Sequence, residues 1–245
     1  MKIIKKWLVL PLMVIAFSVS AQNADEIVAR YFEAIGGVNT WKNLSSIRVT
    51  GKLPTPQGDL TFTICRKAPN LQKVSYDAFG TDIVSRAFDG TKAWSQNPMT
   101  GNPNAVLMSE EETADISDQE FEPALVDYKK KGHGLTFNGE ADIDGMKCFK
   151  ITLTKNKNNK DDIDTEYYFD KENYLLIMQK ETVRSGPAKG NEVESHLSDY
   201  QDVGGLMYPH FLEQKIGGRS VAKLIVEKVE LNAQLENSLF AYPGK

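Results

Sequence analysis

The chain has 245 residues and a formal net charge of −4, with 29 Lys and Arg against 33 Asp and Glu. Because acidic and basic residues are mixed along its length, we expect neither a nucleic-acid-binding patch nor a polybasic membrane tether. The length allows one sizeable hydrophobic core, and all-β barrels and sandwiches of this size occur as single domains.

The chain begins with the three parts of a secretory signal peptide. Three lysines precede an apolar run at residues 7–19, which is shorter than the ~20 apolar residues of a membrane-spanning helix. The small residues Val19 and Ala21 stand at the −3 and −1 positions of a predicted cut. The next residue is glutamine and not cysteine, so no lipid anchor is expected. We predict that residues 1–21 are removed and that residues 22–245 form one domain in the periplasm.

The first predicted element of the mature chain is an amphipathic helix that begins at Asp25 and ends at Gly36 and Gly37. Its apolar residues follow the i, i+3, i+4, i+7 spacing of one helix face: Val28, Tyr31, Phe32 and Ile35. This face must pack on another apolar surface.

After residue 45 the period changes, and apolar residues alternate with polar ones as in half-buried strands. Turn-forming Pro, Asp and Gly residues between the runs indicate hairpins. The clearest strands lie near 47–49, 60–64 and 74–76, and at 135–143, 146–154, 165–170, 173–182, 192–201, 207–216 and 220–231. We predict a mainly β (α+β) fold, with about 10–11 strands in an antiparallel sheet.

A helical insertion interrupts these hairpins. Ser109 with Glu112, and Ser117 with Glu120, have the spacing of capping boxes. Apolar residues at helical spacing follow: Phe121, Leu125 and Tyr128. The expected architecture is an antiparallel sheet curled around, or capped by, helices, and the many hairpins favour an incomplete antiparallel β-barrel with an N-terminal helix and a helical insertion over a sandwich.

The two cysteines, Cys65 and Cys148, stand out of phase with the apolar residues of their predicted strands. Both should therefore point away from the apolar face of the sheet. An exported chain meets an oxidising compartment, but several strands separate the two residues, and whether they pair is left open.

The polar residues indicate no metal, cofactor or catalytic residue. The three histidines lack the short spacing of metal ligands. The acidic loop near residue 162 lacks the glycine and the closing glutamate of a calcium loop, and it is interpreted as a solvated hairpin tip; its acidic residues are Asp161, Asp162, Asp164 and Glu166.

The predicted strands carry many large apolar side chains for a chain that must stay soluble. Most of them fit a packed core, but a concave apolar face that binds a hydrophobic ligand is a second interpretation. These residues are Phe62, Tyr76, Trp94, Tyr167, Phe169, Tyr174, Leu176 and Phe211.

The segment Arg66–Pro98 carries a family resemblance. A basic residue precedes Pro69–Leu71, and after a strand Asp89–Gly90 is followed by Trp94. The order of signal peptide, helix, hairpins, helical insertion and further hairpins agrees, and the ending SLFAYPGK is similar to a Phe-x-x-Pro close. The chain resembles the periplasmic lipoprotein carriers, the outer-membrane lipoprotein-sorting (LolA-like) family.

The resemblance implies a non-enzymatic carrier whose inner barrel face binds acyl chains under the helices. An inner-membrane transporter would hand over the cargo, and an outer-membrane acceptor would receive it. In the bacterial carriers an arginine just before the Pro-Asn-Leu run latches the lid; this chain has Ala68 there, so Arg66 or Lys67 is the predicted latch. We expect a monomer that binds no nucleic acid. The predicted wall and lid residues are Phe62, Ile64, Tyr76, Trp94, Phe121 and Leu125.

Two alternatives stay open at this stage. The same fold could serve as an envelope lipid or lipoprotein sensor, or as a scaffold with a constant protein partner. A secreted hydrolase is the third hypothesis, and it rests only on acidic residues without an assigned role: Asp170, Asp199 and Asp202.

Overall fold

A computed structural model describes most of the chain. The predicted signal peptide, residues 1–21, lies outside the described residues, as do Asp161 and Asp162 of the hairpin tip. No helix in the described part is long and apolar enough to cross a membrane. The described residues are 23–78, 80–98, 102–155 and 163–244.

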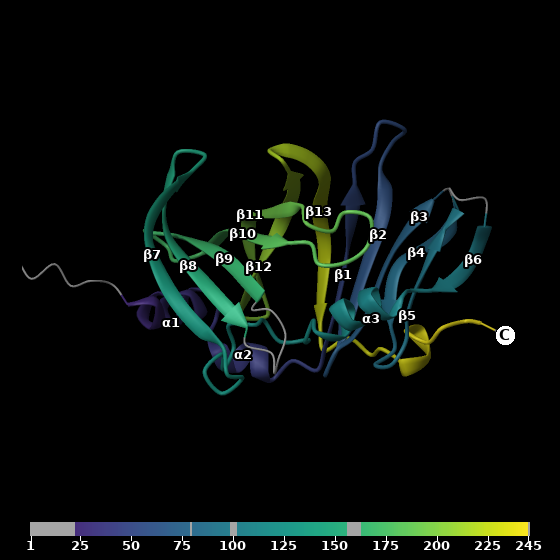
Figure 1. The fold of residues 1–245 in the computed structure, drawn as a ribbon, viewed down its shortest axis with the longest axis horizontal. Helices are drawn as coiled ribbons and strands as arrows, with labels where there is room; N and C mark the ends of the chain where they lie inside the picture. The colour runs from purple at the N-terminus through teal and green to yellow at the C-terminus, as the bar shows by residue number, and fades with distance from the viewer. Residues whose placement is uncertain (1–22, 79, 99–101, 156–162, 245) are drawn as a thin grey trace, which may run out of the picture.

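One antiparallel sheet of 13 strands dominates the fold, in the order β6-β5-β4-β3-β2-β1-β13-β12-β11-β10-β9-β8-β7. It curves without closing into a barrel, so β6 and β7 are its two edges (Figure 1). The strands are β1 (Ser46–Leu53), β2 (Leu60–Lys67), β3 (Leu71–Ala78), β4 (Thr81–Phe88), β5 (Ala93–Asn97), β6 (Asn102–Leu107), β7 (Gly134–Ile143), β8 (Met146–Lys155), β9 (Ile163–Asp170), β10 (Leu176–Thr182), β11 (Glu192–Val203), β12 (Leu206–Ile216) and β13 (Arg219–Leu231). The helices are α1 (Ala24–Ala34), α2 (Val38–Lys42), α3 (Glu110–Ser117) and the short 3-10 turn η2 (Asn237–Leu239).

The mainly β, unclosed antiparallel fold confirms the prediction, but the strand count was too low. The difference arises in residues 81–107, which form β4, β5 and β6. A register shift opposite Val74 and Ser75 breaks the alternation of β4. Strands β5 and β6 have only five and six residues, and β6 contains Pro103. Proline is compatible with an edge strand, but it weakens the strand pattern in the sequence.

The helical insertion is shorter than predicted. Ser109 and Glu112 form the expected capping box of α3. The second predicted helix is wrong: residues 118–133, here called the crossing segment, form turns. Ser117 ends α3 and donates its hydroxyl to the Ala114 carbonyl instead of capping a new helix. Pro123 lacks an N–H and disfavours helical geometry at the residue before it.

The main core lies between the concave face of the sheet and α1. The predicted apolar stripe of α1 is buried, and Tyr31 packs its ring 5.1 Å from that of Phe169 in β9. Asn23 caps the helix by accepting from the backbone N–H of Asp25. The crossing segment adds Leu125 and Val126 to this core before it reaches β7. Helix α1 and the crossing segment therefore cover the β7–β10 part of the concave face.

A second cover comes from the loop between β10 and β11, residues 183–191, which reaches α3 on the other half of the sheet (Figure 1). Arg184 forms an ion pair with Asp115 at 2.8 Å. Ser185 donates to the same carboxylate, and Lys189 pairs with Glu111. The concave face is thus bridged between its two halves by polar contacts.

The cysteines lie on the convex face, as their strand phase predicts. Cys65 packs with Leu235 and Phe240 of the C-terminal segment, and Cys148 packs with Tyr168. Both cysteines are buried and unbonded. The convex face therefore has its own small apolar clusters, one of them under the C-terminal segment.

The turn after α1 generates the first prediction. A Cβ on Gly36 would lie 1.9 Å from the Gly205 carbonyl oxygen, whereas a Cβ on Gly37 meets no atom of the described residues within 4 Å. Both glycines have positive φ, at 99° and 92°. Gly37→Ala should lower the free energy of unfolding by about 1–2 kcal/mol from the left-handed backbone alone. Gly36→Ala should lower the free energy of unfolding by about 1–3 kcal/mol more than Gly37→Ala, because the added Cβ must push the Gly205 backbone away.

Urea unfolding of both variants measures the difference. Because both glycines share the positive φ, Gly37→Ala is the matched control for Gly36→Ala. Equal losses in the two variants would contradict the close packing of α1 against the β11–β12 turn.

Candidate functional site

Part of the concave apolar face stays incompletely covered. Phe62 of β2 pairs with Tyr76 of β3, and Ile64 pairs with Val74, so all four side chains share this face. Phe62 is buried, whereas the other three are half-buried. We call the half-buried residues of this region the open strip: Ile64, Val74, Tyr76, Leu224 and Val226. The open strip lies beside the part of the sheet that α1 covers.

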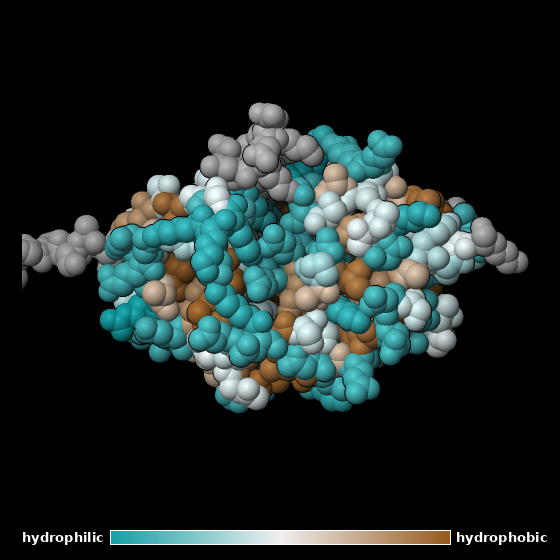
Figure 2. Space-filling model, turned by 90° about the horizontal axis from the view of Figure 1, so that it is seen from below, coloured by the Kyte–Doolittle hydropathy of each residue, from teal (hydrophilic) through white to brown (hydrophobic). Residues whose placement is uncertain are grey.

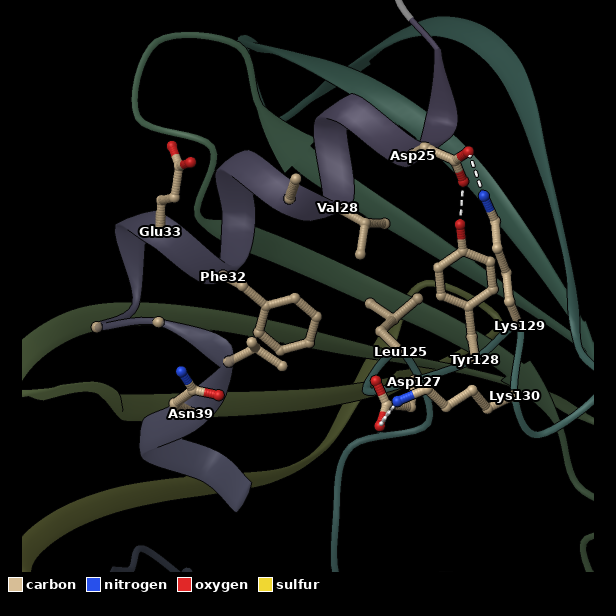
Figure 3. A pocket seen from close by; sticks show the side chains of 14 residues that line it. Asp25, Val28, Phe32, Glu33, Asn39, Leu125, Asp127, Tyr128, Lys129 and Lys130 are labelled. Atoms are coloured by element: carbon tan, nitrogen blue, oxygen red, sulfur yellow. Dashed lines mark hydrogen bonds and ion pairs between the residues drawn. The ribbon is translucent and has the colours of Figure 1, made fainter. Parts of the chain in front are cut away.

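A groove of about 730 Å³ lies between α1, α2 and the crossing segment. Figure 3 shows Val28, Phe32 and Leu125 pointing toward one another across it. Val28, Phe32 and Leu125 are nearly buried, at 3%, 7% and 3% exposure, so the groove reaches down to the main core. Volumes of 300–1,000 Å³ are typical of small-molecule sites. The groove is therefore large enough for a ligand and has an apolar floor.

The rim of the groove is charged, and ion pairs join its walls. Asp25 at the start of α1 accepts from Lys129 at 2.6 Å and from the Tyr128 hydroxyl. Lys42 at the end of α2 contacts Asp127 at 2.7 Å. On the face shown in Figure 2, hydrophobic residues lie between bands of hydrophilic ones. Since exposed ion pairs contribute little stability, the crossing segment is held at its rim by weak contacts.

These contacts shift the pKa of Asp25. The hydrogen bond from Lys129 lowers it most, and the hydrogen bond from Tyr128 lowers it further. The pKa of Lys129 rises in turn, chiefly because of its hydrogen bond to Asp25. Both shifts favour the charged pair that joins α1 to the crossing segment.

Arg66 joins the sheet to the crossing segment. Its Nη2 donates to the Glu120 carbonyl, and its guanidinium lies 6.0 Å from the centroid of the Phe121 ring. Phe121 is buried with Phe62 in one cluster. Of the residues predicted as wall, lid and latch, the structure thus brings Arg66, Phe62 and Phe121 together, while Leu125 lines the groove on the other side.

Two residues of the predicted site lie on the opposite face of the sheet. Lys67 donates to the Leu235 carbonyl at 2.7 Å, and so contacts the C-terminal segment. Trp94 donates its Nε1 to the Phe240 carbonyl at 2.9 Å. As corrections to the sequence-based assignment, Trp94 is not part of the concave wall and Lys67 does not contact the crossing segment. Lys67 is in phase with Cys65, which the sequence already places away from the apolar face, so of the two candidate latches only Arg66 can reach the crossing segment. Trp94 lies in a strand of five residues, where a shift of one residue reverses the face.

The acidic residues behind the hydrolase hypothesis have local structural roles. Asp170 accepts from the backbone N–H groups of Glu172 and Asn173 in the β9–β10 turn. Asp202 accepts from Gly205 in the β11–β12 turn, and Asp199 accepts from the Gln201 side chain. In the described part of the chain, no group of three or more His, Cys, Asp or Glu residues is placed to hold a metal ion.

Comparison with known proteins identifies the fold. No family model and no curated protein matches the sequence. Solved structures do resemble it, at low sequence identity. A LolA superfamily protein from Nitrosomonas europaea has 13% identity and a TM-score of 0.55, covering 90% of this chain and 98% of its own. A putative outer membrane lipoprotein-sorting protein domain from Vibrio parahaemolyticus has 13% identity and a TM-score of 0.53, and the match covers 89% of this chain and 97% of that domain.

A DUF1329 family protein from Desulfovibrio piger has 10% identity and a TM-score of 0.57, covering 89% of this chain and 97% of its own. The fold of this protein is therefore LolA-like. At these identities the similarity extends to the fold alone.

The Asp25 contacts generate the second prediction. A carboxylate with a lowered pKa stabilises the fold fully above the ordinary aspartate value of 3.8, and this stabilisation is lost as the pH falls through the lowered value. Asp25→Asn should therefore have a slightly lower free energy of unfolding than the wild type at neutral pH. This difference, here called the gap, should disappear in acid. Urea unfolding at several pH values measures it.

Two further variants complete this experiment. Lys129→Met should remove most of the same pH-dependent gap, because it deletes the partner of Asp25. Asp59→Asn, in the exposed β1–β2 turn, is the control for the removal of one negative charge. A gap that does not change with pH would contradict the coupling of α1 to the crossing segment.

Proposed function

We propose that this protein is a non-enzymatic periplasmic carrier that binds the acyl chains of lipids or lipoproteins. The groove between α1, α2 and the crossing segment is the observation that carries the proposal. Its floor is apolar, its rim is charged, and its volume of about 730 Å³ falls in the range of ligand sites. This arrangement suits an alkyl chain whose polar end stays in water.

The LolA-like fold supports this class of ligand. One of the similar structures is described as an outer membrane lipoprotein-sorting protein domain. By analogy, an inner-membrane transporter would supply the cargo and an outer-membrane acceptor would receive it, with the carrier acting as a monomer. The analogy rests on the fold, and the groove supplies the chemistry.

The energetics of alkyl chains explain why a carrier is needed. A chain with about fourteen buried methylenes gains on the order of 11 kcal/mol on leaving water, at ~0.8 kcal/mol each. Unassisted transfer across an aqueous space is therefore very slow. A protein that offers comparable burial removes this barrier, provided that it can also release the chain.

Release requires that the groove opens at small cost. The crossing segment is joined to α1 and α2 by the partly exposed pairs Asp25–Lys129 and Lys42–Asp127. Its interior contacts are few, chiefly Phe121, Leu125 and Val126. A closed form favoured by only a few kcal/mol can be displaced by a ligand or an acceptor with higher affinity for the open form.

Blocking the groove tests the proposal. Ala29 is exposed and lines the groove, so Ala29→Trp should fill it without disturbing the core. Glu26→Trp adds the same side chain to the same helix outside the groove lining and is the matched control. In calorimetric titration with dodecanol, we expect at least about tenfold weaker binding for Ala29→Trp, and wild-type binding for Glu26→Trp.

Native mass spectrometry of the protein from its own periplasm provides an independent measurement. Co-purified acylated species are expected. Equal dodecanol binding by the two variants would contradict the groove as the binding site. One stoichiometric protein partner and no lipid would instead favour the sensor or scaffold.

A further inference from the structure

Two arginines lie near each other on the concave face. Arg66 of β2 pairs with Gln72 of β3, and Arg86 of β4 pairs with Val74 of β3. Gln72 and Val74 are two residues apart in one strand, so they point to the same face, and both arginines share it. That face is concave, because Ile64 of the open strip pairs with Val74.

Among the described residues, Arg86 lacks the partners that a buried guanidinium normally has. Its Nε is buried and has no hydrogen-bond partner among the described residues. In the same part of the chain, no carboxylate forms an ion pair with it. The charged group with the largest electrostatic effect on Arg86 is Glu181, an exposed residue at the end of β10.

Arg66, itself a cation, supplies neither a negative charge nor an acceptor for Arg86. It donates one N–H to the Glu120 carbonyl, which carries no net charge. Burial lowers the pKa of both guanidinium groups; at Arg66 the Tyr208 side chain opposes this effect, and the positive charge of Arg86 adds to it. The two side chains therefore repel each other in an environment of low polarity, where an unpaired charge is unfavourable.

An anion would satisfy both groups. Guanidinium groups present several N–H donors in a fixed plane and bind carboxylate and phosphate through paired, charge-assisted hydrogen bonds. The Arg86 side chain is only half-buried as a whole, so a ligand can reach it from the open face. Two neighbouring cations, one of them with a buried donor that has no partner among the described residues, make this region of the concave face suitable for an anion.

Apolar side chains lie on one side of the pair. On the same face Arg86 is flanked by Val74, and Ile64 and Tyr76 continue the open strip next to it. Ile83, which pairs with Tyr76, is buried beside them. A small inorganic anion uses none of this surface, whereas an alkyl chain attached to the anion lies along it.

The geometry points to a binding site at Arg66 and Arg86 for the anionic headgroup of an amphiphile, a carboxylate or a phosphate, whose alkyl chain lies along the open strip. The site is distinct from the groove, because Phe121 and Glu120 face it on one side of the crossing segment while Leu125 lines the groove on the other. The inference rests on the proposed function only for the class of ligand.

Nitrogen NMR of the arginine side chains tests the site directly. Dodecanoate should shift the Nε–H resonance of Arg86, assigned by its loss in Arg86→Met, while dodecanol of equal chain length should not. Arg48 is the internal control, since it pairs with Cys65 on the convex face and lies 3.5 Å from Glu230. Its resonance should stay in place.

Calorimetric titration with the same two probes gives the magnitude. A charge-assisted hydrogen bond corresponds to about ten- to a hundredfold in affinity. Arg86→Met should weaken dodecanoate binding by about that factor and leave dodecanol binding unchanged. Arg48→Met, the matched control, should change neither. The thermal midpoint of each variant confirms that it is folded.

Each other outcome overturns a stated part of the inference. If dodecanol and dodecanoate bind equally and Arg86 does not shift, the headgroup site is wrong while the carrier proposal stands. If neither probe binds, both are wrong. If inorganic phosphate alone shifts Arg86 as strongly as dodecanoate does, the site takes free anions and the role of the open strip is wrong.

Discussion

Burial of the concave apolar face is the constraint on which the rest of this structure depends. The 13-stranded sheet places many large apolar side chains on its concave face, but among the described residues only α1, two shorter helices and two irregular segments are available to cover it. Helix α1 packs tightly where Tyr31 meets Phe169. Elsewhere the cover is thin, which leaves the groove at one side of the crossing segment and the open strip at the other.

Polar contacts at the edges of these covers differ from those inside the concave face. The rim pairs Asp25–Lys129 and Arg184–Asp115 are partly exposed and can exchange with water, so opening them costs little. Arg86 is the opposite case, since its Nε is buried and has no hydrogen-bond partner in the described part of the chain. The fold therefore combines covers that open easily with a buried charge that favours an anionic ligand, and both features suit a protein that takes up and releases amphiphiles.

The sequence predicts those features that depend on local periodicity. The stripe of α1, the capping box of α3, the hairpin turns and the phase of both cysteines all follow from spacing. It does not predict features that depend on long-range contacts. Trp94 is assigned to the concave side because the phase of a short strand is ambiguous, and Lys67 is a candidate latch only because the family motif leaves two basic residues to choose from. Pro123 is the signal that could have excluded the second helix, and the role of Arg86 appears only when β2, β3 and β4 lie side by side.

Paramagnetic relaxation from a nitroxide-labelled alkyl chain tests the central claim most directly. The account predicts that the label broadens the methyl resonances of Val28 and Leu125 in the groove, while Val221, which is 56% exposed near the β12–β13 turn, keeps its line width. Sharp Val28 and Leu125 resonances at saturating label, or equal broadening of Val221, would contradict it.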